Sequence, residues 1–233
     1  VLSDLVFDLA LLLNPGKIFP KEWPEPRAPQ PPSVPPSPTC APQTAQEAGE
    51  AVQAAVAAGR RIGIVGGGTK SGDGGEADVV LSTARLRGIR SCSVDDLVVT
   101  AGAGTRLADL QAELAREGMW TPLVSPWAAA TIGGMVAANF NAPLRMRYGN
   151  VRDIMLAGTV VLPDGRTIRA GRPVVKNVAG YDLPKLFVGS YGTLGLLTDV
   201  SLKLAPLPRA RASLIVPVDS VSQGMRWGRD LLR

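Results

Sequence analysis

The chain has 233 residues, 45% hydrophobic and 19% charged, which is the balance of a globular protein. It has no histidine, the commonest general base and zinc ligand, and its two cysteines lack metal-ligand spacing, so any chemistry must come from a bound cofactor or a partner. The net charge of +5 is scattered, which suits an anionic ligand and argues against nucleic acid.

Residues 1–23 are too short to hold a core, and they begin with Val1, so we expect a fragment of a longer protein. No apolar run approaches the roughly 18 residues that span a bilayer, and no basic segment marks a signal peptide. We therefore expect a cytoplasmic protein, free or held at a membrane through partners. Nine of the 20 prolines fall in residues 24–42, which predicts an extended linker.

Helices and strands alternate after the linker. Residues 43–59 have a helical period of apolar positions and end on Gly59. Strands are predicted at 60–65, 78–82 and 96–102, and Thr105 is predicted to cap a helix that ends at Gly118. This alternation predicts a small, mostly parallel sheet in a first lobe covering about residues 43–125.

The second half predicts more antiparallel structure. TIGGMVAANF, from residue 131, is a short glycine-opened helix, and residues 154–171 form a hairpin around a PDG turn. YDLPKLFVG is a brief helix, and a long strand follows from residue 194. We expect a second lobe at about 126–208, with residues 209–233 starting a truncated following domain.

The glycine loop GGGTK, residues 66–70, follows a predicted strand. It either presents backbone N–H groups to a phosphate or supplies positive φ for a tight turn. Two common phosphate motifs fail, because Thr69 replaces the last glycine of a P-loop and Leu107 replaces that of a Rossmann fingerprint. Three further clusters, TIGGM, RYGN and GSYGTLG, indicate a ligand as long as a dinucleotide.

Four stretches carry a resemblance to a known family: GGGTK, TIGGMVAAN, RYGNVRD and VVKNVAGYDLPKLFVGSYGTLGLLTDVSLKLAPLP. They resemble the FAD-binding domain of the p-cresol methylhydroxylase (PCMH) and vanillyl-alcohol oxidase superfamily, and within it the FAD-binding subunit of bacterial glycolate oxidase. Tyr191 stands where relatives of the catalytic subunit carry glutamate, which favours the FAD-binding subunit. NPGKIFP, residues 14–20, resembles the C-terminal end of the catalytic subunit, which implies a natural fusion, although an ordinary turn is the alternative.

The resemblance implies an α+β fold, a two-lobed FAD-binding PCMH-type domain with a small mostly parallel sheet lobe and a larger antiparallel sheet lobe. Backbone amides of the glycine loop and groups of the opposite lobe would hold the pyrophosphate of an extended FAD, with the charge of Lys70 nearby. The chain has no histidine to tether a flavin, so the FAD is expected to be non-covalent, and no metal is expected. The candidate cofactor residues are Gly66, Gly67, Gly68, Thr69, Lys70, Thr131, Gly133, Gly134, Arg147, Tyr148, Gly195, Leu196 and Leu197.

The implied function is that of an FAD-binding component of a glycolate (2-hydroxy acid) oxidase-like complex, with a catalytic flavoprotein subunit and an iron–sulfur subunit as partners. In such a reaction the substrate gives its α-hydrogen to the flavin as hydride while a base takes the hydroxyl proton. The catalytic residues stay unknown: Lys176 reads as a surface charge, Tyr181 as a core residue, and three arginines could hold a carboxylate, namely Arg145, Arg147 and Arg152. The alternatives are a cofactor-free scaffold subunit and an FAD-dependent oxidase of another alcohol.

Overall fold

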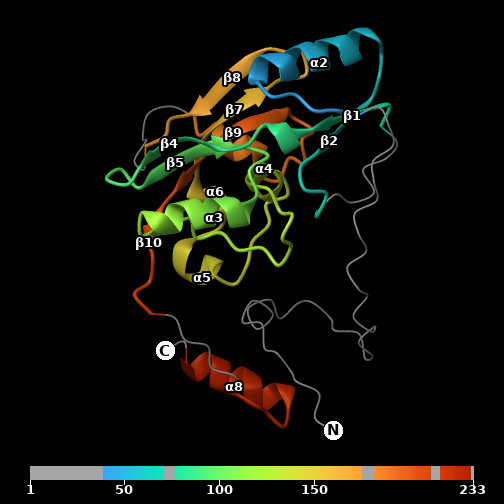
Figure 1. The fold of residues 1–233 in the computed structure, drawn as a ribbon. Coiled ribbons are helices and arrows are strands. Elements are labelled where there is room, and N and C mark those ends of the chain that lie inside the picture. The colour runs from blue at the N-terminus through green and yellow to red at the C-terminus, as the bar shows by residue number, and fades with distance from the viewer. Residues whose placement is uncertain (1–38, 71–76, 175–180, 211–215, 232–233) are drawn as a thin grey trace. The chain divides into compact units, whose positions relative to one another are not determined.

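The computed structural model describes residues 39–70, 77–174, 181–210 and 216–231. Within residues 39–207 a small parallel sheet and a larger antiparallel sheet pack together with short helices (Figure 1), which confirms the predicted fold class. The elements of this unit are β1 (Thr39–Cys40), α2 (Ala45–Ala57), β2 (Ile62–Val65), β3 (Val79–Ser82), η1 (Thr83–Arg85), β4 (Ile89–Ser93), β5 (Val98–Gly102), α3 (Leu107–Arg116), β6 (Met119–Trp120), α4 (Ile132–Ala137), α5 (Arg145–Tyr148), α6 (Val151–Ile154), β7 (Met155–Val161), β8 (Thr167–Gly171), α7 (Pro184–Phe187), β9 (Leu196–Lys203) and β10 (Ala205–Pro206).

The small sheet has the order β1-β3-β2, and all its neighbours are parallel. The end of the segment predicted as a linker forms β1, because an edge strand leaves one side unpaired and so tolerates proline-rich surroundings. Residues 24–38 of that segment lie outside the described residues, as do residues 1–23. The predicted helix α2 is confirmed: Thr44 caps it by accepting the Glu47 N–H at 3.1 Å.

The large sheet has the order β4-β5-β9-β7-β8 and is antiparallel throughout. The predicted hairpin is β7 and β8, and the predicted long strand is β9, at the centre of the sheet. The expectation that strand 96–102 joins the parallel sheet is wrong. It becomes β5, because only a short turn, with Leu97 at φ 57°, separates it from β4, and such a turn joins antiparallel strands.

The main core lies where helices α3 and α4 pack with the large sheet, and Leu110, Met135 and Val200 are fully buried in it. The prediction that Thr105 caps helix α3 is wrong. The helix begins at Leu107, and the Thr105 hydroxyl instead accepts the Gly88 N–H at 2.9 Å. The Thr105 hydroxyl therefore forms a hydrogen bond with the loop at Gly88 instead of capping the helix.

A second core cluster joins the two sheets. We call the small sheet with α2 the small lobe, and the large sheet with its helices the large lobe. Ala48, Val52 and Leu81 of the small lobe pack with Val161 and Leu196, which come from β7 and β9 of the large lobe. Beside them, α2 lies against the β7–β8 turn, where the Gln53 side-chain amide donates to the Asp164 carbonyl at 3.3 Å. Apolar side chains from both lobes thus share one buried cluster.

Helix α8 (Val221–Leu231) belongs to a separate unit. Its large apolar side chains are exposed: Val221, Met225, Trp227 and Leu231. In the part of the chain that the structure describes, no helix is both long and apolar enough to cross a bilayer.

The carboxylate of Asp78, just before β3, accepts from the Arg61 backbone N–H at 2.8 Å and from the Arg61 guanidinium at 3.1 and 3.2 Å. These bonds, the side-chain ones first, lower its pKa to about 2. Because the folded pKa lies below the usual 3.8, the stabilisation is present above that value and is lost as pH falls through about 2. In an NMR titration we expect the Asp78 midpoint near 2, and a return toward the ordinary range in Arg61→Gln. An ordinary midpoint in the wild type would contradict the contact.

Candidate functional site

The glycine loop of residues 66–70 leaves β2 and touches the large lobe. A Cβ on Gly67 would overlap the Ala129 carbonyl oxygen, and one on Gly66 would overlap the Thr131 hydroxyl. Both glycines have ordinary φ, whereas Gly68 has φ 66°. The first two glycines are therefore needed for close approach to Ala129 and Thr131, and the third supplies the positive φ of a turn. The phosphate-binding role of the loop stays a prediction.

The backbone N–H groups of Gly67 and Thr69 donate to no acceptor among the described residues. The opposite segment differs, because the Gly133 N–H donates to the Ala103 carbonyl at 2.8 Å and the Gly134 N–H to the Thr131 hydroxyl at 3.2 Å. Thr131 is thereby the N-cap of α4. The available backbone donors thus lie on the glycine loop, while Ala129 and Thr131 build the surface that the loop approaches and Gly133 packs against Ala103.

Lys70 reaches from the glycine loop to two aromatic rings of the large lobe. Its ammonium lies 5.1 Å from the Trp127 ring centroid and 5.2 Å from that of Phe140, and it donates to the Thr69 hydroxyl at 3.0 Å. The two rings pack edge to face at 5.0 Å. Burial lowers the pKa of Lys70. Sequence reasoning missed this aromatic pair, because nothing in the spacing of Trp127 and Phe140 marks them as neighbours of Lys70.

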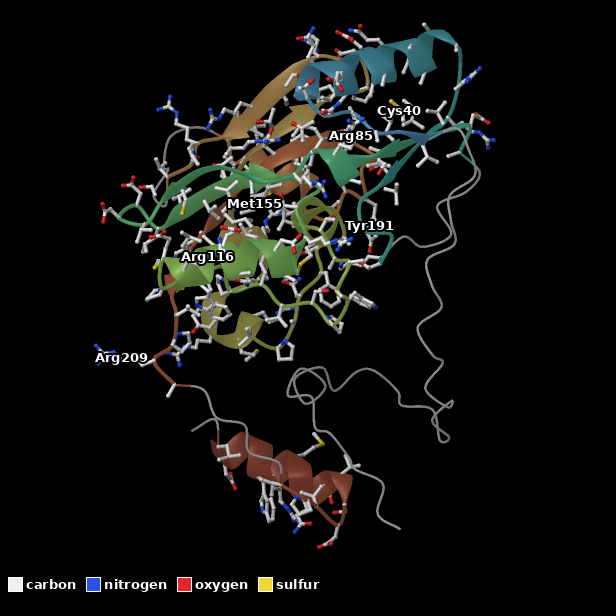
Figure 2. The ribbon with its side chains drawn as sticks, in the orientation of Figure 1. Cys40, Arg85, Arg116, Met155, Tyr191 and Arg209 are labelled. Atoms are coloured by element: carbon white, nitrogen blue, oxygen red, sulfur yellow. The ribbon has the colours of Figure 1, made fainter. Side chains whose placement is uncertain are left out.

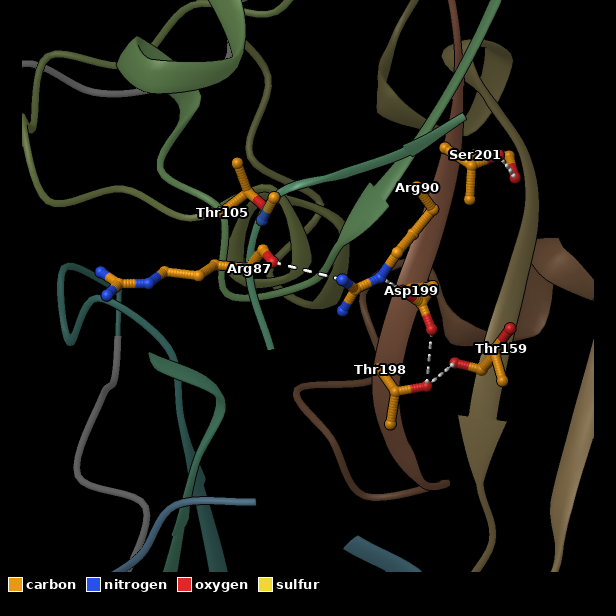
Figure 3. Close-up of polar contacts among 9 residues, drawn as sticks. Arg87, Arg90, Thr105, Thr159, Thr198, Asp199 and Ser201 are labelled. Atoms are coloured by element: carbon orange, nitrogen blue, oxygen red, sulfur yellow. Dashed lines mark hydrogen bonds and ion pairs between the residues drawn. The ribbon is translucent and has the colours of Figure 1, made fainter. Parts of the chain in front are cut away.

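A cavity of about 550 Å³ opens where the glycine loop meets Thr131, a size that suits part of a dinucleotide. The loop that carries Arg87 and Gly88 forms another wall. Figure 3 shows the contacts of Arg90 with Arg87 and Asp199. Arg90 holds this wall, since its guanidinium donates to Asp199 at 2.9 Å and to the Arg87 carbonyl at 3.4 Å. The lining residues are Gly66, Gly67, Ala84, Arg87, Gly88, Ile89, Gly104, Thr105, Arg106, Asp109, Leu110, Glu113, Ala129 and Thr131.

The fourth glycine cluster, residues 189–195, closes on the other end of α4. The Gly189 N–H donates to the Val136 carbonyl at 3.0 Å and the Tyr191 N–H to the Ala137 carbonyl at 2.9 Å, so the cluster satisfies the helix C-terminus. Gly192 meets the small lobe, where an added Cβ would lie 3.0 Å from Ile64 Cδ1. The structure therefore gathers the first, second and fourth clusters around α4.

Gly195, Leu196 and Leu197 enter β9. A Cβ on Gly195 would lie 2.7 Å from the Val161 carbonyl oxygen, so glycine is required there by β7. Leu196 and Leu197 are buried in the core, and both pair with β7. Pairing with β5 begins only at Asp199, so on that side no described strand covers the backbone of the two leucines.

The third cluster lies elsewhere in the large lobe. The Tyr148 ring packs edge to face on Trp120 of β6 at 5.3 Å, and the Arg147 guanidinium lies 5.6 Å from the Tyr148 ring. Among the described residues, no hydrogen bond, ion pair or ring contact joins Arg147 or Tyr148 to residues 66–70. Arg152 donates to the Lys185 carbonyl at 3.3 Å.

One other sequence expectation fails here. Tyr181 was expected in the core but is 94% exposed, because it precedes α7, whose buried residues are Pro184 and Phe187. Cys92 lies in strand β4. Lys176, the other residue considered near the flavin, lies outside the described residues.

Comparison with known proteins agrees with this arrangement. A family described as an FAD binding domain matches residues 36–171. Glycolate oxidase subunit GlcE of Escherichia coli (strain K12) is 45% identical over 130 residues, which cover 55% of this chain and 37% of that protein. A D-lactate dehydrogenase of Anaerostipes hadrus is 36% identical over 163 residues, which cover 70% of this chain and 34% of that protein.

A solved alkyldihydroxyacetonephosphate synthase superposes with a TM-score of 0.64 at 22% identity, over 74% of this chain and 34% of that chain, which shows the shared fold. The chain spans about a third of the length of the curated relatives above. Because the family model covers more than half of the sequence, the protein belongs to the family of FAD binding domains.

Proposed function

We propose that the chain is the FAD-binding part of an oxidoreductase acting on 2-hydroxy acids such as glycolate, as a component of a glycolate oxidase-like complex. The observation that carries the proposal is the glycine loop, whose Gly67 and Thr69 N–H groups have no described acceptor where the loop meets the Thr131 segment. The E. coli relative is named as a glycolate oxidase subunit and the A. hadrus relative as a D-lactate dehydrogenase. Glycolate and lactate are both 2-hydroxy acids, which supports that substrate class.

The residues present fit an FAD. The Gly67 and Thr69 N–H groups, which have no acceptor among the described residues, would receive the pyrophosphate, because backbone N–H groups in a concave loop bind anions. Lys70 adds a cation beside them, and the start of β9 at Leu196 and Leu197, which no described strand covers on the β5 side, would lie along the cofactor. When bound, the flavin supplies the redox chemistry, and this chain supplies binding and orientation.

Attachment would be non-covalent, since the chain has no histidine and its two cysteines sit on strands β1 and β4. The partners would be a catalytic flavoprotein subunit and an iron–sulfur subunit. The name of the E. coli relative as a glycolate oxidase subunit supports assembly with other chains. We assign no base to the described residues near the glycine loop, so proton transfer would fall to another part of the complex.

The first test is a visible spectrum of the purified chain with and without added FAD, followed by acid precipitation. We expect flavin absorption that leaves the protein with the acid supernatant, because the cofactor is held by hydrogen bonds and packing. Addition of glycolate or D-lactate to the loaded complex should then bleach the flavin band. A folded, colourless chain that ignores FAD would instead support the cofactor-free scaffold, and colour that stays with the precipitate would refute non-covalent binding.

A further inference from the structure

Tyr191 has a backbone conformation that its side chain does not favour. Its φ is 51°, in the left-handed region, where glycine and asparagine are at ease and a bulky aromatic residue is an outlier. The flanking hydrogen bonds fix this geometry, because the Tyr191 N–H is held by the Ala137 carbonyl at 2.9 Å. Folding alone would be served better by glycine or asparagine at this position.

Packing of the Tyr191 ring does not offset this strain. The residue is 63% exposed, and its ring contacts no other aromatic ring among the residues that the structure describes. The rest of the loop is well fixed, since Gly189 is bonded to Val136 and the Ser190 hydroxyl donates to the Phe187 carbonyl at 3.0 Å. A rigid loop therefore presents a flat, largely exposed ring.

The position of this ring is close to the proposed cofactor path. The next residue, Gly192, packs on Ile64, two residues before the glycine loop, and the same loop continues into the start of β9, where Leu196 and Leu197 pair with β7 but not with β5. Figure 2 shows Tyr191 on the side of the molecule where the chain leaves β2. At the other end of the glycine loop, Lys70 turns toward Trp127 and Phe140.

We infer that Tyr191 stacks on the adenine base of the bound FAD. This inference rests on the proposed FAD role. Purine bases stack on exposed aromatic rings, and the Tyr191 ring is such a ring beside the proposed cofactor path. The left-handed backbone conformation orients the ring for this contact.

The test uses the full chain and the FAD dissociation constant, measured by quenching of flavin fluorescence. Tyr191→Phe keeps the ring and should bind FAD within about twofold of the wild type. Tyr191→Asn removes the ring but tolerates positive φ, so it should fold at least as well and bind FAD roughly tenfold more weakly. Leu194→Asn, at an exposed residue of the same loop, is the matched control and should leave the affinity unchanged.

Spectra separate the two ends of the cofactor. At saturating FAD, the visible flavin bands of Tyr191→Asn should match those of the wild type, because the ring touches the adenine. A band shift would place the ring on the flavin and overturn the inference, as would an unchanged FAD affinity in Tyr191→Asn. If the wild-type chain itself fails to bind FAD, the proposed function falls together with the inference, so the two failures are distinguishable.

Discussion

Gly67→Ala is expected to cost about 3 kcal/mol of unfolding free energy, at the upper end of the roughly 1–3 kcal/mol typical of overpacking. The added methyl group would overlap the backbone oxygen of Ala129, which cannot rotate away as a side chain could. The loop and the Ala129 segment must separate, and the Gly67 and Thr69 donors then lose their alignment. We expect FAD affinity to fall by at least about tenfold, since preorganised donors are lost. Urea unfolding and FAD titration measure the two effects.

The matched control is Gly59→Ala. Gly59 has φ 64° but no atom within 4 Å of an added Cβ, so this change costs only the left-handed conformation, about 1 kcal/mol. Its FAD affinity should not change. Equal losses of unfolding free energy and of FAD affinity in the two variants would mean that the close contact of Gly67 with Ala129 adds nothing to either quantity.

Met135→Ala is expected to lower the free energy of unfolding by about 3 kcal/mol, which is within the usual range of roughly 2–5 kcal/mol for such a truncation. Met135 is fully buried in α4, which Thr131 caps. The last carbonyls of this helix accept hydrogen bonds from the Gly189 and Tyr191 N–H groups. A domain is stable by only about 5–15 kcal/mol, so thermal melting should begin much lower. Added FAD should recover part of the loss, because a ligand that binds only the folded state stabilises it.

Met146→Ala provides the comparison, since Met146 is 53% exposed in α5. Its melting temperature should stay close to that of the wild type. If the Met135 and Met146 variants melt alike, α4 is not packed as described. If FAD fails to raise the melting temperature of either variant, the glycine loop does not bind it under those conditions.

Sequence patterns predicted those elements whose signal is local. Helix α2, the β7–β8 hairpin and strand β9 have clear periodicity or turn residues, and all three are confirmed. The strand that became β5 was placed in the wrong sheet, because its own residues do not say which strand lies beside it. Its two antiparallel neighbours are β4, which the sequence patterns did not predict, and β9, about a hundred residues later in the chain.

The site shows the same division. The glycine loop and Thr131 could be singled out from the sequence, and the structure brings them together. The aromatic pair around Lys70 could not, since contact of Trp127 with Phe140 depends on how the chain folds around α4. Tyr181 failed for a related reason, because an aromatic residue flanked by apolar neighbours carries no local sign of exposure.

The cluster formed by Ala48, Val52, Leu81, Val161 and Leu196 bears on how a cofactor can enter. Rotation of one lobe away from the other would separate the members of this cluster and expose their apolar side chains to water. The lobes should therefore behave as one cooperative body that melts in a single transition. Entry and exit of a ligand must then proceed by rearrangement of surface loops, and neither lobe can be transplanted without the other.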